Sequence, residues 1–161
     1  MKSKDILKCF EEAIAVSFSS REMNKIAKTL ADSVRVRAQL GGSVADTGSK
    51  KKPFKALSPS YKKQRKEFTG LSDKTTPNKS NVTRTGQMID SIKGIGKKAG
   101  FEILPSGKRS DTQLSNDDVA QYVEEQGRPF LNLSDKEVKE LTRLLQESIA
   151  DEINKCLNRS K

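Results

Sequence analysis

The chain has 161 residues, of which 33% are hydrophobic and 5% aromatic, so we expect a single domain with a modest core for its length. No apolar run approaches the roughly 18 residues of a transmembrane helix, and acidic residues interrupt the apolar N-terminal positions of a would-be signal peptide. The net charge is +10, and the chain contains no histidine, which removes the commonest general base and a major zinc ligand. We therefore expect a chain made and used in a cytoplasm, without a cofactor or metal.

The positive charge is concentrated in the middle of the chain. Residues 50–109 hold 16 Lys and Arg against 4 Asp and Glu, whereas residues 110–161 hold 7 against 11. A run of like charges is usually a solvated face. A block this one-sided is also a candidate for contact with nucleic acid or with an acidic partner subunit. Both interpretations remain open from the sequence.

The N-terminal part, residues 4–40, predicts two helices. Apolar residues recur with helical period over 4–16, and a second stripe follows after Ser19 and Glu22, which have the spacing of a capping box. The second helix is expected to close at Gly41-Gly42. Cys9 and Cys156 each lie in an apolar helical pattern, and we expect both to be buried, unpaired thiols.

The next segment, 42–52, is small, polar and basic, and predicts an exposed mobile loop. Ser58 with Pro59 after it indicates a short capped helix that carries many basic residues. The basic residues that we expect to face DNA or an acidic neighbour are Lys50, Lys51, Lys52, Lys55, Lys62, Lys63, Arg65 and Lys66.

Further along, Thr85 is expected to cap a short helix that holds Met88 and Ile89. Two apolar runs, 92–95 and 101–104, flank a glycine-rich turn over 96–100 and predict a β-hairpin. A polar loop over 105–115, to which we assign no role, then leads to a helix over 117–125.

The C-terminal part contains the most informative pattern. Gly127-Arg128-Pro129-Phe130-Leu131 breaks the helical pattern, and its ordinary interpretation is a turn with Phe130 and Leu131 in the core. Ser134 and Glu137 then form a capping box, and an apolar stripe continues to Leu157. This predicts a long amphipathic helix that needs a partner surface.

Three short blocks, in this order, resemble the virion morphogenesis, or tail completion, family of tailed bacteriophages. They are an aromatic and Leu-Ser block before a basic turn near 54–66, a Thr-Gly and Ser-Ile block over 85–92, and the Gly-Arg-Pro-Phe-Leu block. The resemblance covers roughly residues 53–157, and the polar loops depart from the family pattern. The motif residues, to which the resemblance gives structural or interface roles, are Thr85, Gly86, Tyr122, Gly127, Arg128, Pro129, Phe130 and Leu131.

The resemblance implies a structural protein of the neck or tail end that acts in tail completion and head–tail joining. Its expected partners are copies of itself in a ring, most simply a hexamer, together with other neck, connector and tail-tube proteins and DNA in the channel. We expect an α+β fold in which N-terminal helices and the Ser134–Leu157 helix cover a small antiparallel sheet over 92–104. Tyr122, Phe130 and Leu131 should be core or intersubunit anchors, and Arg128 should pin the turn by hydrogen bonds.

Two other functions have some support in the sequence. Asp117, Asp118, Glu124 and Glu125, with Glu102 and Asp90, could form a magnesium site of a nuclease. Carboxylates at 117 and 118 are however typical of a helix N-terminus, and no nuclease motif, P-loop or nucleophile elbow accompanies them, so we expect no enzyme. The alternative is a DNA-binding protein that contacts phosphates without sequence preference through the basic 50–66 segment.

Overall fold

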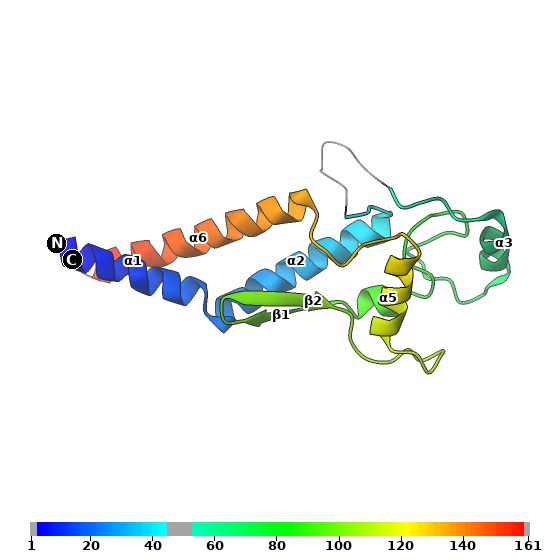
Figure 1. Ribbon diagram of the computed structural model, residues 1–161, viewed down its shortest axis with the longest axis horizontal. Coiled ribbons are helices and arrows are strands. Elements are labelled where there is room, and N and C mark those ends of the chain that lie inside the picture. Colours follow the sequence, from blue (N-terminus) through cyan, green and yellow to red (C-terminus); the bar gives the residue numbers. More distant parts are fainter. Residues whose placement is uncertain (1–2, 45–52, 160–161) are drawn as a thin grey trace.

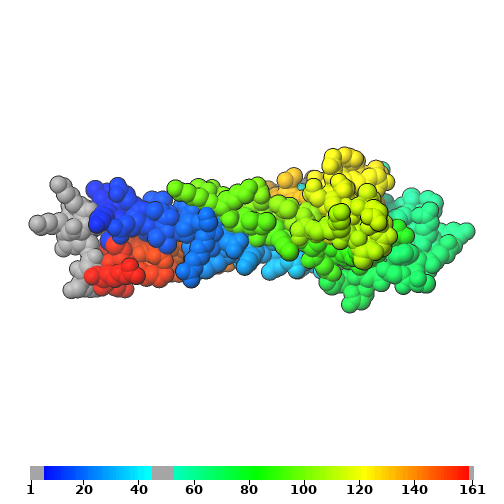
Figure 2. Space-filling model, turned by 90° about the horizontal axis from the view of Figure 1, so that it is seen from below, coloured from blue at the N-terminus to red at the C-terminus, as the bar shows by residue number. Residues whose placement is uncertain are grey.

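The computed structural model describes residues 3–44 and 53–159, with side chains from Ile6 onward, and is elongated (Figures 1 and 2). One end is a helical arm made of α1 (Ser3–Ser17) and α6 (Asp135–Arg159), which lie side by side (Figure 1). The other end is a largely irregular lobe with the short helices α3 (Pro59–Glu67), α4 (Gln87–Asp90) and α5 (Asn116–Glu125). Helix α2 (Ser20–Leu40) and a hairpin connect the two ends. The predicted α+β class is confirmed.

Helix α2 begins and ends as its sequence predicts. The Ser19 hydroxyl accepts a hydrogen bond from the Glu22 amide, and Gly41 closes the helix in the left-handed region at φ 89°. Its buried side chains run along the whole helix, and five of the seven belong to two core clusters. Met23, Ile26 and Leu30 pack with side chains of the hairpin and of α6, so α2 lies between the sheet and the C-terminal helix.

The hairpin consists of β1 (Lys93–Lys97) and β2 (Gly100–Leu104), paired antiparallel with Ile95 opposite Glu102. The predicted turn over 96–100 was too long, because Gly96 lies within β1 and the chain reverses at Lys98 and Ala99. Gly94 and Gly96 are needed for packing rather than for turning. A Cβ at Gly94 would lie 2.0 Å from the Ala27 carbonyl oxygen, and one at Gly96 2.0 Å from the Asn24 amide nitrogen. The strand backbone thus lies directly against α2.

Helix α6 has the predicted capping box. Glu137 Oε2 accepts hydrogen bonds from the Ser134 amide at 2.7 Å and from the Ser134 hydroxyl at 2.8 Å, and the Glu137 amide donates back to Ser134 Oγ at 3.5 Å. Both residues are buried. The helix start is therefore part of the interior rather than a solvent-exposed cap. Within the described residues, no helix has the length and apolar character that crossing a lipid bilayer requires.

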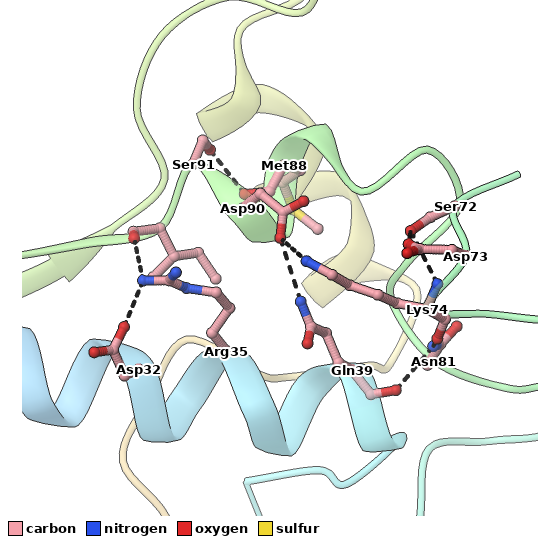
Figure 3. A network of polar contacts seen from close by, with 11 residues as sticks. Asp32, Arg35, Gln39, Ser72, Asp73, Lys74, Asn81, Met88, Asp90 and Ser91 are labelled. Carbon is pink, nitrogen blue, oxygen red and sulfur yellow. Dashed lines mark hydrogen bonds and ion pairs between the residues drawn. The ribbon is translucent and has the colours of Figure 1, made fainter. Parts of the chain in front are cut away.

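A polar network joins α2 to the lobe (Figure 3). Asp90, at the end of α4, accepts hydrogen bonds from Gln39 at 3.3 Å and from Lys74 at 2.9 Å. Asn81 donates to the Gln39 carbonyl at 2.9 Å, and Arg35 donates to the Ile92 carbonyl at 3.4 Å. The irregular loop over 72–81 is thus fixed to regular structure by side chains, since it has few backbone partners of its own.

The two cysteines form a disulfide between α1 and α6, with their Cα atoms 5.7 Å apart, so the prediction of unpaired thiols was wrong. The sequence shows each cysteine only in its local pattern, where each one fits the apolar stripe of a helix. Only the antiparallel packing of α1 on α6 brings Cys9 beside Cys156 across 147 residues of chain. The bond closes nearly the whole chain into one loop and joins the two helices of the arm.

Candidate functional site

Helix α1 carries large apolar side chains that remain about half exposed beside its contact with α6. These side chains, which we call the α1 stripe, are Ile6, Leu7, Phe10 and Ile14, and they are 38–63% exposed. Positions 6, 10 and 14 lie one turn apart on the same side of a helix. A helix of a self-contained protein normally turns such a stripe toward its core.

The inner face of α1, in contrast, carries small side chains. Cys9, Ala13 and Ser17 are almost completely buried, and α1 packs on α6. The disulfide lies in the packing surface between α1 and α6. The helix therefore buries its small residues against α6 and leaves its large ones partly exposed beside that contact. This partly exposed apolar strip makes the α1 stripe the strongest candidate interaction surface in the described chain.

Helix α6 is amphipathic as predicted, but it does not bury its stripe either. Leu141, Leu144 and Leu145 pack against the α2 cluster while remaining half-buried, and Ile149 and Ile153 further along the arm are also half-buried. Two helices side by side leave the margins of broad apolar stripes exposed to solvent. Part of the apolar surface of both arm helices therefore remains exposed to solvent.

The basic residues predicted to face DNA or an acidic neighbour differ in their exposure to solvent. Lys55, Lys63 and Lys66 are exposed on the lobe and Lys62 is half-buried, and within the described residues none of the four forms an ion pair. Lys50, Lys51 and Lys52 lie outside the described residues.

Arg65 was predicted to face a partner, and this is wrong, because it is 1% exposed. Its guanidinium donates to Thr75 Oγ1 at 2.7 Å and to the carbonyl oxygens of Thr83 at 3.0 Å and Lys79 at 3.2 Å. Burial lowers the pKa of Arg65, and the charges of Arg84 and Arg128 act in the same direction, although Tyr61 opposes them. The side chain fixes the 75–83 loop from within. A basic run in the sequence does not reveal which member turns inward.

The Gly-Arg-Pro-Phe-Leu turn supplies core side chains, as predicted. Phe130 is fully buried in the cluster that includes Ala38 and Ile89, and Leu131 packs against that cluster. Gly127 adopts a φ of 76°, which favours glycine at this position. Pro129 is exposed, and its carbonyl accepts a hydrogen bond from the Val44 amide at 3.2 Å.

Two residues that no sequence pattern indicates hold this turn. Arg37 donates to the carbonyl oxygens of Phe130 at 2.9 Å and Asn132 at 2.8 Å, and its Nε donates to Glu137 at 2.9 Å. Glu124 accepts from the amides of Phe130 and Leu131 at 3.3 and 3.1 Å. The role predicted for Arg128 belongs to Arg37, because Arg128 reaches only the Lys55 carbonyl, at 3.5 Å. Spacing along the chain gives no sign of the Arg37 contacts, since they span more than 90 residues.

The remaining motif residues also differ from expectation. Tyr122 is 62% exposed, so it is not a core anchor, and its interface role stays a prediction. Thr85 does not cap α4; Gly86 is the N-cap residue at φ 87°, and Thr85 Oγ1 instead accepts a hydrogen bond from Arg109 at 3.2 Å. Arg109 also pairs with Asp111, whose carboxyl pKa this contact holds below its usual range. The 105–115 loop is thereby fixed to the Thr-Gly block.

The acidic residues that the sequence offers for a magnesium site do not converge. Asp118 caps α5 by a reciprocal pair of hydrogen bonds with Ser115, and Glu124 holds the 130–131 backbone. Asp90 binds Lys74, and Glu102 pairs with Lys97 on the hairpin. In the part of the chain that the structure describes, no group of three metal-ligating side chains could hold an ion.

The described chain therefore offers two features that suit binding, the α1 stripe on the arm and a basic lobe at the opposite end, rather than a catalytic constellation. Comparisons of the chain with protein-family models, with curated proteins and with solved structures found no match.

Proposed function

We propose that this protein is a structural subunit that assembles with copies of itself into a ring, at the neck or tail end of a tailed bacteriophage, during tail completion and head–tail joining. The observation that carries the assembly part of the proposal is the α1 stripe, which leaves large apolar side chains in water while small ones occupy the arm's interior. The resemblance of three ordered sequence blocks carries the viral part.

Covering the α1 stripe would contribute free energy to assembly. Complete burial of a Leu, Ile or Phe side chain contributes about 1.5–3 kcal/mol. The four stripe residues are between 38% and 63% exposed, so covering them in an interface would contribute about half of that value each, several kcal/mol per subunit. A closed ring uses heterologous contacts, in which the arm of one copy docks on a different surface of the next.

The size of the particles in solution tests the assembly proposal. The wild-type protein should form a defined ring by light scattering and by negative-stain electron microscopy, with a hexamer as the expected size. Phe10→Ser combined with Ile14→Ser should release monomers with a smaller loss of unfolding temperature than a change in the buried core, because both side chains are about half exposed. Ile95→Ser is the matched control, since Ile95 is 44% exposed, as Phe10 is, but lies on the hairpin. A monomeric wild type, or a double variant that still forms rings, would contradict the proposal.

A separate experiment tests the place in the virion. Loss of the gene should leave DNA-filled heads and defective or unjoined tails, and labelled protein should appear at the head–tail junction of purified particles. Complementation with the Phe10→Ser and Ile14→Ser variant should fail, whereas Ile95→Ser should restore infectious particles. Normal virions without the protein would refute the viral role and leave the assembly result intact.

A second candidate function is sequence-independent DNA binding through the lobe. It is favoured by Lys55, Lys62, Lys63 and Lys66, for which the described residues provide no acidic partner. Binding to a mixed-sequence duplex should then weaken steeply with salt, and the salt slope should fall by about 0.9 for each phosphate that a variant no longer neutralises. Lys62→Gln with Lys63→Gln should lower that slope, and an unchanged slope would exclude these residues from the DNA interface.

A further inference from the structure

A pocket of about 280 Å³ opens on the lobe, and no residue of α1 lines it. Its lining combines aliphatic side chains, among them Leu57 and Val123, with four arginines, Arg65, Arg84, Arg109 and Arg128. No aspartate or glutamate among the described residues lines it. Such a mixture of an apolar wall and converging cations is typical of a site for a ligand with an apolar body and a negative charge.

The positive charge at this pocket is largely uncompensated. Arg65 is buried and bonds only neutral oxygens, of Thr75, Lys79 and Thr83. Arg84 and Arg128 lie near enough to Arg65 to disfavour its charged form. Of the four arginines, Arg109 alone has a carboxylate partner in the described chain, namely Asp111, with its Nε 2.8 Å from the Asp111 oxygen. Arg65 is buried, Arg128 half-buried and Arg84 exposed, and an anion bound beside the two less exposed cations would stabilise their charge.

Several donors of the pocket are also unused. The Arg84 guanidinium lies 4.3 Å from the centre of the Phe68 ring, which positions it, and it donates no hydrogen bond within the described residues. Arg128 donates one long hydrogen bond, and its Nε has no partner. The hydroxyl of Thr83, a residue that is 1% exposed and lines the pocket, has no partner either. Buried polar groups without partners are uncommon in folded proteins and are typical of sites that bind a ligand or water.

We propose that this pocket binds a segment of a partner protein in which a carboxylate lies beside an apolar side chain. The carboxylate would pair with Arg84 and Arg128, because a guanidinium matches a carboxylate with two parallel hydrogen bonds. The apolar side chain would enter between Leu57 and Val123. The site is separate from the α1 stripe, so its failure would leave the proposed assembly function standing.

The lining favours a peptide over nucleic acid. Single-stranded nucleic acid is typically bound in a groove that follows its backbone, with aromatic faces on which bases stack. Here the cavity is small, and its lining combines aliphatic side chains with arginines and threonines. Two tyrosines also line it: Tyr61 has one face directed at Arg65, whose guanidinium lies 5.8 Å from the ring centre, and Tyr122 is 62% exposed. Duplex DNA would reach only the rim arginines and would leave the aliphatic interior empty.

A random peptide library, displayed on beads and selected with the full-length protein, tests the proposal and requires no assumption about the identity of the partner. The selected peptides should carry aspartate or glutamate next to a large apolar residue. One such peptide, synthesised with a fluorescent label, should bind in an anisotropy assay. A control peptide with glutamine or asparagine in place of the glutamate or aspartate should bind at least about tenfold more weakly, as expected when a charged hydrogen-bonded pair is removed.

Variants then assign the binding to the pocket. Arg84→Gln is the primary variant because Arg84 is exposed, and it should weaken the labelled peptide about tenfold with no change in unfolding temperature. Arg128→Gln should act in the same way. Lys63→Gln is the matched control, since it removes an exposed positive charge of the lobe outside the pocket and should change the affinity less than about twofold.

Three results would overturn the proposal. The library could yield no acidic and apolar consensus, the Arg84→Gln variant could bind the selected peptide as well as the wild type, or Lys63→Gln could weaken it equally. A labelled 20-base-pair duplex serves as the second probe. If the duplex binds with the same dependence on Arg84 while acidic peptides do not, the site belongs to phosphate recognition and the peptide proposal is wrong.

Discussion

Replacement of Arg37 by methionine should be among the most damaging single changes in this chain. Arg37 and Glu137 form an ion pair at 2.9 Å with side chains only 9% and 5% exposed, and Arg37 also holds the carbonyl oxygens of Phe130 and Asn132. Methionine fills similar space but leaves the Glu137 carboxylate buried without its counter-charge. Breaking a buried pair in this way costs about 3–5 kcal/mol.

The free energy of unfolding, measured by urea denaturation with far-ultraviolet circular dichroism at one fixed protein concentration, should fall by that amount. Arg143→Met is the matched control on α6, because Arg143 is 52% exposed and its pairs with Glu140 and Glu147 lie in solvent. Its replacement should cost no more than about 1 kcal/mol. A double variant, Arg37→Met with Glu137→Gln, should be less unstable than the effects of the two single variants added together.

Equal destabilisation by Arg37→Met and Arg143→Met would refute the reasoning. A decrease of less than about 1 kcal/mol in the unfolding free energy of Arg37→Met would also refute it, because burial of the ion pair would then contribute little to stability. The comparison separates burial from charge pairing, since both arginines make ion pairs and differ mainly in their exposure to water.

Three further predictions concern other parts of the fold. Cys156→Ser should leave Cys9 as a free thiol that a thiol reagent can modify. It should also lower the free energy of unfolding by roughly 5 kcal/mol, because the disulfide closes a loop of nearly the whole chain. Equal thiol reactivity in wild type and variant would contradict the presence of the disulfide. Gly94→Ala should cost about 1–3 kcal/mol or more by overpacking against α2, whereas Gly100→Ala, where a Cβ meets nothing within 4 Å, should stay within about 0.5 kcal/mol. The Ser115 hydrogen bonds lower the pKa of the Asp118 carboxyl in the folded state, so the ionised carboxylate stabilises the fold above the unfolded pKa and this effect disappears as the pH falls through the folded pKa. The difference in unfolding free energy between wild type and Asp118→Asn should therefore shrink in acid. A difference that does not depend on pH would exclude the helix cap as its source.

Local patterns in the sequence predicted most of the regular structure. Ser19 and Glu22, Ser58 and Pro59, and Ser134 with its glutamate three residues later begin helices where their spacing indicates. These signals work because a cap satisfies backbone groups within one turn of itself. The hairpin was predicted from its apolar runs, but its turn was misplaced, because a glycine in sequence does not say whether it serves a turn or a close approach to another element.

The sequence by itself determined where helices and strands form, that the core is modest, that positive charge gathers in the middle of the chain, and that Phe130 belongs inside. The tertiary structure alone decided that Cys9 meets Cys156, that Arg65 turns inward, that Arg37 holds the Phe130 turn, and that the large apolar side chains of α1 stay partly exposed. The physical reason is the separation along the chain of the groups that interact. Periodicity and capping depend on groups a few residues apart, whereas burial, ion pairing and disulfide formation depend on which surfaces meet after the chain has returned on itself.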